Sequence, residues 1–413
     1  AYALMSRKPD LSFAKMWRMI GRNPSDPMIT ELREQYFPYK VYANETMHGA
    51  TCIQQEETFY TPEELLAMMM QHAKDMTKNY GGKSISDCVI TVPSHFTQHQ
   101  RRALINSAEV ADLRVLSLVE ENTAAALHYG IDRVFEKPHT ILYYNMGSAS
   151  TQVSIVTYDS YKTKEAGKNK TIGQFEVNGK GWDRHLGGFN FDVKLADLLA
   201  ERFDEGWSKK KKYVKGSTVK DQIVPMAKLR AQANKVKEVL SANPFFPVKA
   251  EQLFADVDLS TKVTREEFEK ACEDLYTKVT APIDDALSMA NMELTDIHAV
   301  EMLGGGVRMP RIKKTLDEYF SKATTTVTDE ETKVETTTKV EVGQHLNGDE
   351  AMALGAAFRA ANLSSSFRVR KVGMWDTSAY GVGIQLETLP ASEEEESSFL
   401  GGLLGGAKKV EKE

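Results

Sequence analysis

The alternation of apolar and polar positions in the first 150 residues predicts strands and helices in turn. Two short apolar runs, Cys88–Val92 and Val115–Val119, have the length and β-branched character of buried strands. Residues 98–110 place apolar side chains at helical spacing between them, and the stretch EENTAAALHYG after the second run is typical of a short helix. A third strand is expected at Ile141–Asn145. Strands that alternate with helices through short connections are typical of a layered α/β domain.

A capping signature marks the start of an earlier helix. Thr61 and Glu64 form a capping box, and Pro62 suits the first turn of a helix. Apolar residues then follow at helical spacing from Leu65 to Met76, so one face of this helix is expected to pack on a core.

The pattern changes to long charged helices between residues 187 and 282, of which VPMAKLRAQANKVKEVLSA is the clearest. A strand is again expected at AVEMLGGG, with further helices at Pro310–Phe320 and at about Asp349–Leu363. Residues 323–342 are rich in threonine and charge, which is typical of an exposed insertion.

Composition excludes several classes of protein. The 413 residues are 41% hydrophobic and 27% charged with a net charge of -6, and Lys209–Lys212 is the one dense basic run, so we expect no nucleic-acid binding. No apolar run approaches the roughly eighteen residues of a membrane span, and three scattered cysteines favour neither a disulfide framework nor a zinc site. The first residues lack the pattern of a signal peptide, so we expect that any targeting segment has been removed or was never included.

Three Asn-x-Ser/Thr sequons permit N-glycosylation, and their number is near that expected by chance. They are Asn44, Asn169 and Asn362.

Three turns of small residues stand at strand ends or helix starts: NMGSAS, HLGGFNFD and LGGGVRMP. One such turn is more often structural punctuation than a binding site. Three turns beside α/β elements favour a nucleotide cleft, because their backbone N–H groups can approach phosphates closely. A nucleotide hydrolase usually has a carboxylate at the end of the preceding strand, where this chain has Asn145.

At these turns the sequence resembles the seventy-kilodalton heat shock protein (Hsp70) family of chaperones. EENTAAALHYG resembles the family's NEPTAAAIAYG, HLGGFNFD resembles HLGGEDFD, LGGGVRMPRI resembles VGGSTRIPKI, and NGDEAMALGAA resembles NPDEAVAYGAA. The matches follow the family's order and extend from about residue 11 to residue 385. The stretches IVTYDSYKTKEAG, VKEVLSAN and KVTREEFE are closer to a branch of large, glucose-regulated members from the endoplasmic reticulum.

The resemblance implies an α/β, actin-like, two-lobed ATPase fold with an incomplete first lobe, followed by the start of a β-rich substrate-binding domain. Residues 1–137 would form part of lobe I, and 138–363 would form lobe II, with the long helices at about 187–282 and the insertion at 323–342. Residues 364–390 would begin the β-rich domain, and 391–413, which are acidic and glycine-rich, are expected to be a mobile tail.

The resemblance also implies a set of ATP- or ADP-binding residues. Phosphates would meet the turn after the third strand, the sugar and phosphates would lie near the second turn, and the adenosine would lie between the charged helix and the third turn. Glu121 would lie near the metal ion and its waters, with Mg²⁺ the expected ion. The other positions implied to bind nucleotide are Gly147, Ser148, Ala149, Ser150, Gly187, Gly188, Lys237, Ser241, Gly304, Gly305, Gly306, Arg308 and Asp349.

The chain departs from the family at positions that bear on hydrolysis, and no catalytic residue is assigned. Trp17 stands where hydrolysing members have a lysine directed at the γ-phosphate, and an indole cannot replace that charge. Lys15 is expected to lie on a different helical face and to be a poor substitute. Asn145 and Gln152 replace two carboxylates, which argues against tight magnesium binding. The family's first strand and Gly-Thr phosphate loop do not precede Ala1, so part of the site is expected to be missing from this chain.

The resemblance implies a chaperone of the large heat-shock class in the lumen of the endoplasmic reticulum. It would hold unfolded clients and act as a nucleotide-exchange factor for a lumenal heat-shock chaperone. The alternative is a conventional ATP-hydrolysing chaperone. A sugar or acetate kinase on the same fold would need an acceptor carboxylate for which no motif is present, and a structural filament protein agrees less well with the strand-like pattern after Ser366.

Overall fold

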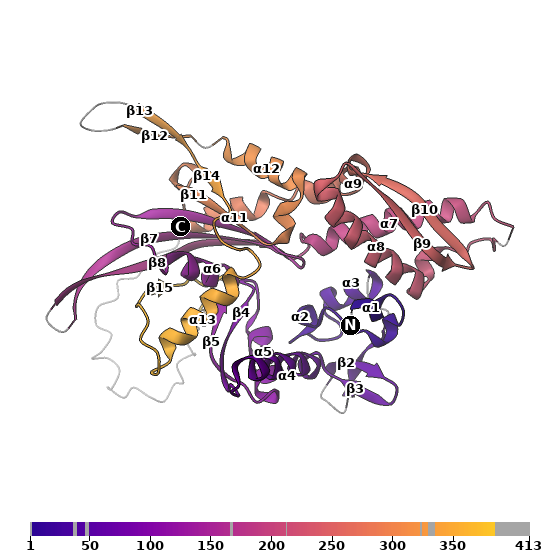
Figure 1. Cartoon of the computed structure of the whole chain (residues 1–413), viewed down its shortest axis with the longest axis horizontal. Helices are drawn as coiled ribbons and strands as arrows, with labels where there is room; N and C mark the ends of the chain where they lie inside the picture. Colours follow the sequence, from indigo (N-terminus) through magenta and orange to yellow (C-terminus); the bar gives the residue numbers. More distant parts are fainter. Residues whose placement is uncertain are drawn as a thin grey trace, which may run out of the picture. The chain divides into compact units, whose positions relative to one another are not determined.

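A computed structural model describes residues 2–35, 39–45, 49–165, 168–211, 213–322, 324–328 and 335–384 (Figure 1). The chain forms two compact units, Ala1–Ala379 and Tyr380–Glu413. The tail expected at 391–413 lies outside the described residues, and the elements below all belong to the first unit.

A six-stranded mixed sheet organises the first unit, in the order β14-β11-β6-β7-β8-β15. Strands β6, β7 and β8 pair antiparallel, β11 and β14 run parallel to β6, and β15 runs parallel to β8. The bounds are β6 His139–Met146, β7 Thr151–Glu165, β8 Lys168–Asp183, β11 Ala299–Leu303, β14 Glu341–Gly343 and β15 Gly373–Trp375.

Both faces of β6 are buried, as its continuous apolar run predicts. Leu142 and Tyr144 pack in one hydrophobic cluster with the helices that follow β8 and β11. Ile141 and Tyr143 point to the opposite face and pack with residues of α6 (Glu121–Gly130) and α13 (Ala351–Leu363). Figure 1 shows these two helices side by side.

The strands predicted near the start of the chain form a parallel pair, β4 (Asp87–Val92) and β5 (Arg114–Glu120), joined through α5 (Gln98–Val110). Before them, α4 (Pro62–Gly81) begins at the predicted capping box, in which the Glu64 backbone N–H donates to Thr61 Oγ1 at 3.1 Å. These predicted elements are confirmed to within one or two residues.

The first sixty residues form short helices and a small antiparallel sheet that the hydrophobic pattern had not identified. The elements are α1 Tyr2–Met5, a 3-10 turn Pro9–Leu11, α2 Met16–Met19, α3 Pro27–Gln35, β1 Val41–Asn44, β2 Ala50–Gln55 and β3 Thr58–Tyr60.

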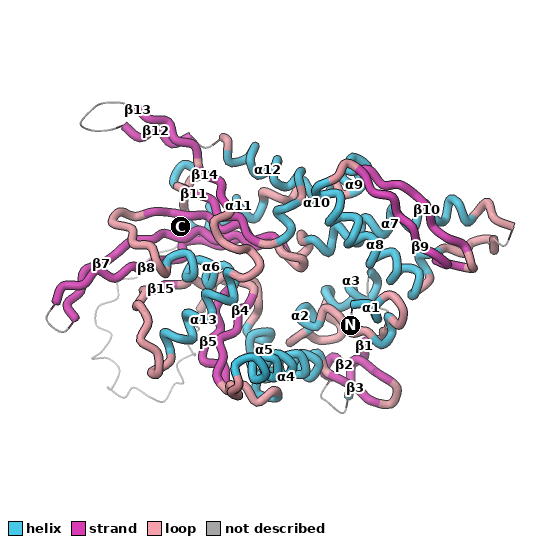
Figure 2. The backbone as a smooth tube through the Cα atoms, in the orientation of Figure 1, coloured by secondary structure: helices cyan, strands magenta, loops and turns pink. Residues whose placement is uncertain are grey.

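The region expected to hold long charged helices has helices and also a hairpin, β9 (Phe245–Phe254) with β10 (Val257–Thr264), which packs on α8 (Figure 2). FFPVKAEQLF alternates buried and exposed positions, so a period of two was present and the prediction of helix alone was wrong there. The helices are α7 Gly188–Trp207, α8 Ile223–Ala242, α9 Arg265–Ala271, α10 Glu273–Tyr276 and α11 Ala281–Ala290, with 3-10 turns at Val219–Asp221 and Leu294–Asp296.

Helix α12 (Pro310–Phe320) is found where it was predicted, after a 3-10 turn at Gly305–Arg308. Within the predicted insertion, β12 (Thr324–Thr328) and β13 (Glu335–Lys339) pair as an antiparallel hairpin, while residues 323 and 329–334 lie outside the described part. The domain boundaries expected at 137, 363 and 390 stay predictions.

The three sequons lie in different surroundings. Asn169 is exposed on β8, and Asn44 is half-buried at the end of β1. Asn362 is half-buried on α13 and donates through Nδ2 to the Phe358 carbonyl at 3.2 Å. Of these side chains, that of Asn169 is the most accessible to a glycosyl group.

Candidate functional site

Parallel pairing of β6 with β11 brings two of the glycine turns together. Asn145 is the register partner of Leu303, so the turn that starts at Gly147 and the turn that starts at Gly304 leave the same edge of the sheet. Gly304 has φ 80, and a Cβ there would lie 2.4 Å from the Met146 carbonyl oxygen. Only glycine fits where the two turns approach so closely.

The second motif packs onto the first through backbone groups. The Gly188 N–H donates to the Gly147 carbonyl at 3.0 Å, and the Phe189 N–H donates to the Ser148 carbonyl at 2.9 Å. A Cβ on Gly187 would lie 2.5 Å from the Ser148 carbonyl oxygen. The start of α7 is thereby held against the Gly147–Ser148 turn.

These turns enclose a cavity of about 410 Å³, which we call the glycine-turn cavity. Its lining combines backbone from all three turns with polar side chains from α8 and from the 3-10 turn after β11. The lining residues are Gly147, Ser148, Gly188, Asn234, Lys237, Glu238, Ser241, Gly305, Gly306, Arg308 and Met309.

Arg308 and Asp349 form an exposed ion pair at 2.9 Å beside this cavity. A Cβ on Gly305 would have no atom within 4 Å, so this backbone faces open space. The cavity is thus open at the Gly305–Arg308 side.

Some of the predicted residues lie outside the glycine-turn cavity. The Ala149 carbonyl accepts a hydrogen bond from the Arg18 guanidinium, and Ser150 is buried. Glu121 accepts from the Gln152 amide Nε2 at 2.6 Å. Burial raises the pKa of Glu121, and the hydrogen bond from Gln152 opposes this shift.

Asp192 and Asn234 are polar residues of the site that the sequence reasoning missed. Lys237 Nζ lies 2.7 Å from Asp192 Oδ1 and 3.0 Å from the Gly188 carbonyl oxygen, and Asn234 Nδ2 donates to Asp192 Oδ2 at 3.2 Å. Burial raises the pKa of the Asp192 carboxyl, and the Lys237 ammonium opposes the shift. The sequence alone could have predicted Asp192, because it is the last residue of the HLGGFNFD motif and lies one turn into α7.

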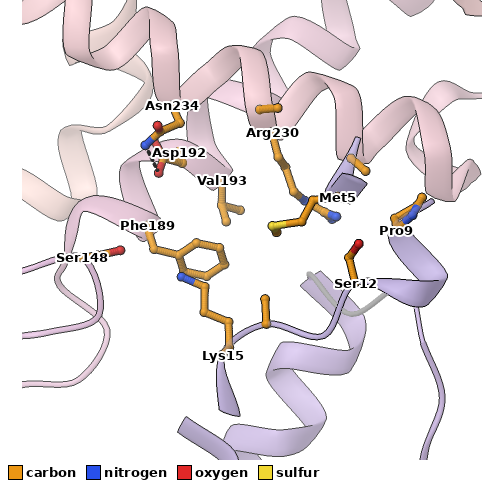
Figure 3. A pocket seen from close by; sticks show the side chains of 13 residues that line it. Met5, Pro9, Ser12, Lys15, Ser148, Phe189, Asp192, Val193, Arg230 and Asn234 are labelled. Atoms are coloured by element: carbon orange, nitrogen blue, oxygen red, sulfur yellow. Dashed lines mark hydrogen bonds between the residues drawn. The ribbon is translucent and has the colours of Figure 1, made fainter. Parts of the chain in front are cut away.

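A second cavity of about 330 Å³ adjoins the first, and Ser148 and Asn234 line both. We call it the Lys15 cavity. Figure 3 shows Lys15 rising from the chain before α2 toward the Phe189 ring, with Arg230 on the α8 side. The further residues that line it are Met5, Pro9, Ser12, Ala14, Asp192, Val193, Ala227 and Ala231.

The expectation that Lys15 lies on a turned-away helical face is wrong. Lys15 precedes α2 and has left-handed backbone geometry, with φ 65 and ψ 23. Its Nζ lies 4.0 Å from the centroid of the Phe189 ring. Burial, reinforced by the Arg18 charge, lowers the pKa of Lys15 to about 8.

Trp17 is half-buried and lines neither of these two cavities, but it lines a smaller one of about 30 Å³ together with Ala149 and Ser150. Its ring centroid lies 5.3 Å from that of Phe96, so the indole packs against the hydrophobic cluster that contains Phe96, Ile20 and Leu104. The indole therefore contributes to packing at this position.

The residues present do not fit a divalent cation held by protein carboxylates. Asn145 is buried and neutral. Gln152 Oε1 accepts from the Ser94 N–H at 2.8 Å, and its Nε2 is engaged with Glu121, so this amide links two parts of the fold. Among the described residues, no group of three or more His, Cys, Asp or Glu side chains is placed to hold a metal ion.

In the part of the chain that the structure describes, no helix has both the length and the apolar character needed to cross a bilayer.

Comparison with known proteins identifies the family. The model of the family described as "Hsp70 protein" matches residues 5–397. The chain is 35% identical over 400 residues to hypoxia up-regulated protein 1 of Danio rerio, with 96% of this chain and 38% of that protein covered. It is 35% identical over 403 residues to hypoxia up-regulated protein 1 of Xenopus tropicalis, covering 97% of this chain and 58% of that protein.

The similarity extends to plants. Heat shock 70 kDa protein 17 of Arabidopsis thaliana is 34% identical over 391 residues, covering 94% of this chain and 42% of that protein. The chain thus spans between 38% and 58% of the length of these three curated relatives.

The predicted α/β fold of the actin-like ATPase class is confirmed by the family match together with the mixed α/β architecture and its several sheets. This chain belongs to the Hsp70 family, and within the family it is similar to hypoxia up-regulated protein 1.

Proposed function

We propose that this member of the Hsp70 chaperone class binds ATP and ADP in the glycine-turn cavity. The observation that carries the proposal is that three glycine motifs, distant in sequence, line one cavity of about 410 Å³ together with Lys237, Ser241 and Arg308. That volume lies within the range of about 300–1,000 Å³ typical of small-ligand sites.

The chemistry of the lining suits the two ends of a nucleotide. The backbone of Gly147 and Ser148 offers close approach to phosphate oxygens. On the opposite side, Lys237 and Ser241 can hydrogen-bond the sugar, and the Arg308 guanidinium can stack on an aromatic base. No magnesium-dependent step is assigned, because the side chains of Asn145 and Gln152 are neutral amides.

Gly305→Asp is expected to weaken binding of both ADP and ATP at least about tenfold, equivalent to about 1.4 kcal/mol. The position faces open cavity space, so a carboxylate there occupies ligand volume and repels phosphate. Isothermal titration calorimetry with each nucleotide measures the effect.

Gly206→Ala is the matched control for this variant. Gly206 lies in α7 outside the cavity, and a Cβ there would meet no atom within 4 Å. The control should bind nucleotide like the unmodified chain. Absence of nucleotide binding by the unmodified chain at millimolar concentration, or equal binding by Gly305→Asp, would contradict the proposal.

The finer function follows from similarity to hypoxia up-regulated protein 1. We place the protein in the lumen of the endoplasmic reticulum, where it holds unfolded clients and promotes nucleotide exchange on a lumenal heat-shock chaperone. To promote nucleotide exchange, the protein must bind the open form of its partner more tightly than the closed form, because a ligand with equal affinity for both forms does not change their equilibrium. Nucleotide in the glycine-turn cavity would stabilise the arrangement that binds the partner.

Stopped-flow release of fluorescent ADP from the lumenal partner is expected to accelerate when the full-length protein carrying this chain is added. Gly305→Asp should reduce the acceleration, since it weakens the nucleotide that stabilises the binding-competent form. Gly206→Ala should leave it unchanged. The exchange proposal is rejected if the full-length protein, loaded with ATP, leaves the rate of ADP release unaltered at matched concentrations.

A further inference from the structure

A further cavity, of about 310 Å³, lies apart from the two that meet at Ser148, and we call it the Arg359 cavity. Its walls come from α6, from the β7–β8 hairpin, from the second half of α13 and from the segment that leads into β15. It shares no lining residue with the glycine-turn cavity or with the Lys15 cavity. A ligand in it would therefore occupy a site separate from the one proposed for nucleotide.

Four apolar side chains line the Arg359 cavity. Leu127 and Ile172 are buried, with exposed fractions of 2% and 7%. Val372 and Met374 are half-buried and pack against the cluster that contains Leu127. The volume is at the lower end of the range of about 300–1,000 Å³ typical of small-ligand sites. The cavity thus suits the apolar body of a small molecule.

Arg359 provides a cation in this apolar cavity. Its Nε atom is buried, and among the described residues it has no hydrogen-bond partner. Lys371 also lines the cavity, but it has an interaction of its own. No Asp or Glu side chain is among the described residues that form the lining. Because a buried, charged N–H group without an acceptor is costly, the cavity favours a ligand that brings an anionic oxygen.

A carboxylate attached to an alkyl chain meets both requirements. A carboxylate can accept two parallel hydrogen bonds from a guanidinium, through Nε and a terminal nitrogen. The other polar side chain on the α13 wall, Asn362, already donates through Nδ2 to the Phe358 carbonyl at 3.2 Å. A peptide would bury amide groups that find few partners on these walls, whereas an alkyl chain needs none.

We propose that the Arg359 cavity binds an aliphatic carboxylic acid, with its carboxylate on the Arg359 guanidinium and its alkyl chain against Leu127 and Ile172. The site is independent of the nucleotide proposed for the glycine-turn cavity. Since Val372 and Met374 form part of the wall, the bound acid also holds the segment that leads into β15 against α13.

Isothermal titration calorimetry with decanoate, octanoate and methyl decanoate tests the two parts of the site on the unmodified chain. Decanoate should bind at least about tenfold more tightly than methyl decanoate, which keeps the alkyl chain but has no charge to pair with Arg359. Octanoate has two methylenes fewer and should bind about tenfold more weakly than decanoate. Equal affinities for decanoate and its methyl ester would contradict the proposal.

Arg359→Met should weaken decanoate binding about ten- to a hundredfold, the range for losing a hydrogen bond to a charged group. Methyl decanoate binding should change by less than about twofold, because the ester has no charged contact with Arg359. Arg368→Met is the matched control, since it removes the same charge from an exposed residue that does not line the cavity. Thermal melting of each variant reports folding.

The inference is overturned if decanoate does not bind at millimolar concentration, or if Arg359→Met weakens decanoate and its methyl ester equally. An acetylated tripeptide that ends in leucine with a free carboxylate is titrated in the same way. Tighter binding of this peptide than of decanoate would assign the cavity to peptide ends and reject an aliphatic acid as its ligand. Hydrogen exchange adds a local readout, because saturating decanoate should slow exchange in β15 and leave the exchange of β4 unchanged.

Discussion

ATP turnover by this protein is expected to be about 10²–10³-fold slower than turnover by a conventional Hsp70 chaperone under the same conditions, the effect typical of losing one group that stabilises a developing charge. Trp17 is half-buried and packs against Phe96, and the neutral amides of Asn145 and Gln152 stand where hydrolysing members are expected to carry carboxylates.

Steady-state phosphate release, measured beside a conventional family member, checks this expectation. Asn145→Asp is nearly isosteric and introduces one carboxylate at the end of β6, so it should raise the rate. Gly206→Ala serves again as the control for handling and folding. Turnover within about tenfold of the conventional chaperone would favour the alternative function, an active ATP-hydrolysing chaperone.

Lys180→Met is expected to destabilise the folded chain by about 3–5 kcal/mol, the usual consequence of removing one partner of a buried ion pair. Lys180 is fully buried on β8, and its Nζ lies 2.7 Å from Glu120 Oε2, 2.6 Å from Asp376 Oδ1 and 2.5 Å from the Thr377 carbonyl oxygen. The substitution leaves two carboxylates facing one another without the ammonium between them. Urea unfolding followed by circular dichroism measures the change in the free energy of unfolding.

The loss of unfolding free energy caused by Lys180→Met should depend on pH. Burial raises the pKa of Glu120 even with Lys180 in place, and loss of the ammonium must raise it further. A carboxyl whose pKa is raised in the folded state favours folding at low pH and loses that contribution as pH rises through the folded pKa. The deficit of Lys180→Met should thus be smaller at pH 5 than at pH 7.

Arg114→Met is the matched control, because Arg114 pairs with Asp87 at 2.7 Å on the exposed surface and should matter little for stability. Hydrogen exchange adds a local readout. Lys180→Met should increase exchange in β15, which directly precedes Asp376, before it affects β6 in the core. The ion-pair account fails if Lys180→Met and Arg114→Met have the same midpoint in urea.

Local chemistry explains why several elements could be predicted from the sequence. The capping box at Thr61, the apolar run at Ile141–Asn145 and the proline at the start of α12 each act within a few residues, so their effect is present in the local sequence. The β9–β10 hairpin was missed for a related reason. Its half-exposed strands carry charged residues, such as Lys249 and Glu251 on β9, and these resemble the charged residues on the polar faces of the neighbouring helices.

The sequence by itself determined the α/β alternation, the glycine turns and the neutral residues at Asn145 and Gln152, because these depend on residue type and short spacing. Only the tertiary structure decided which of them meet. Pairing of β6 with β11 brings Gly147 and Gly304 to one edge, and the packing of α7 against α8 joins Asp192 to Lys237. The place of Lys15 depended on a left-handed backbone and on the Phe189 ring, a contact between segments far apart in the chain that no local pattern encodes.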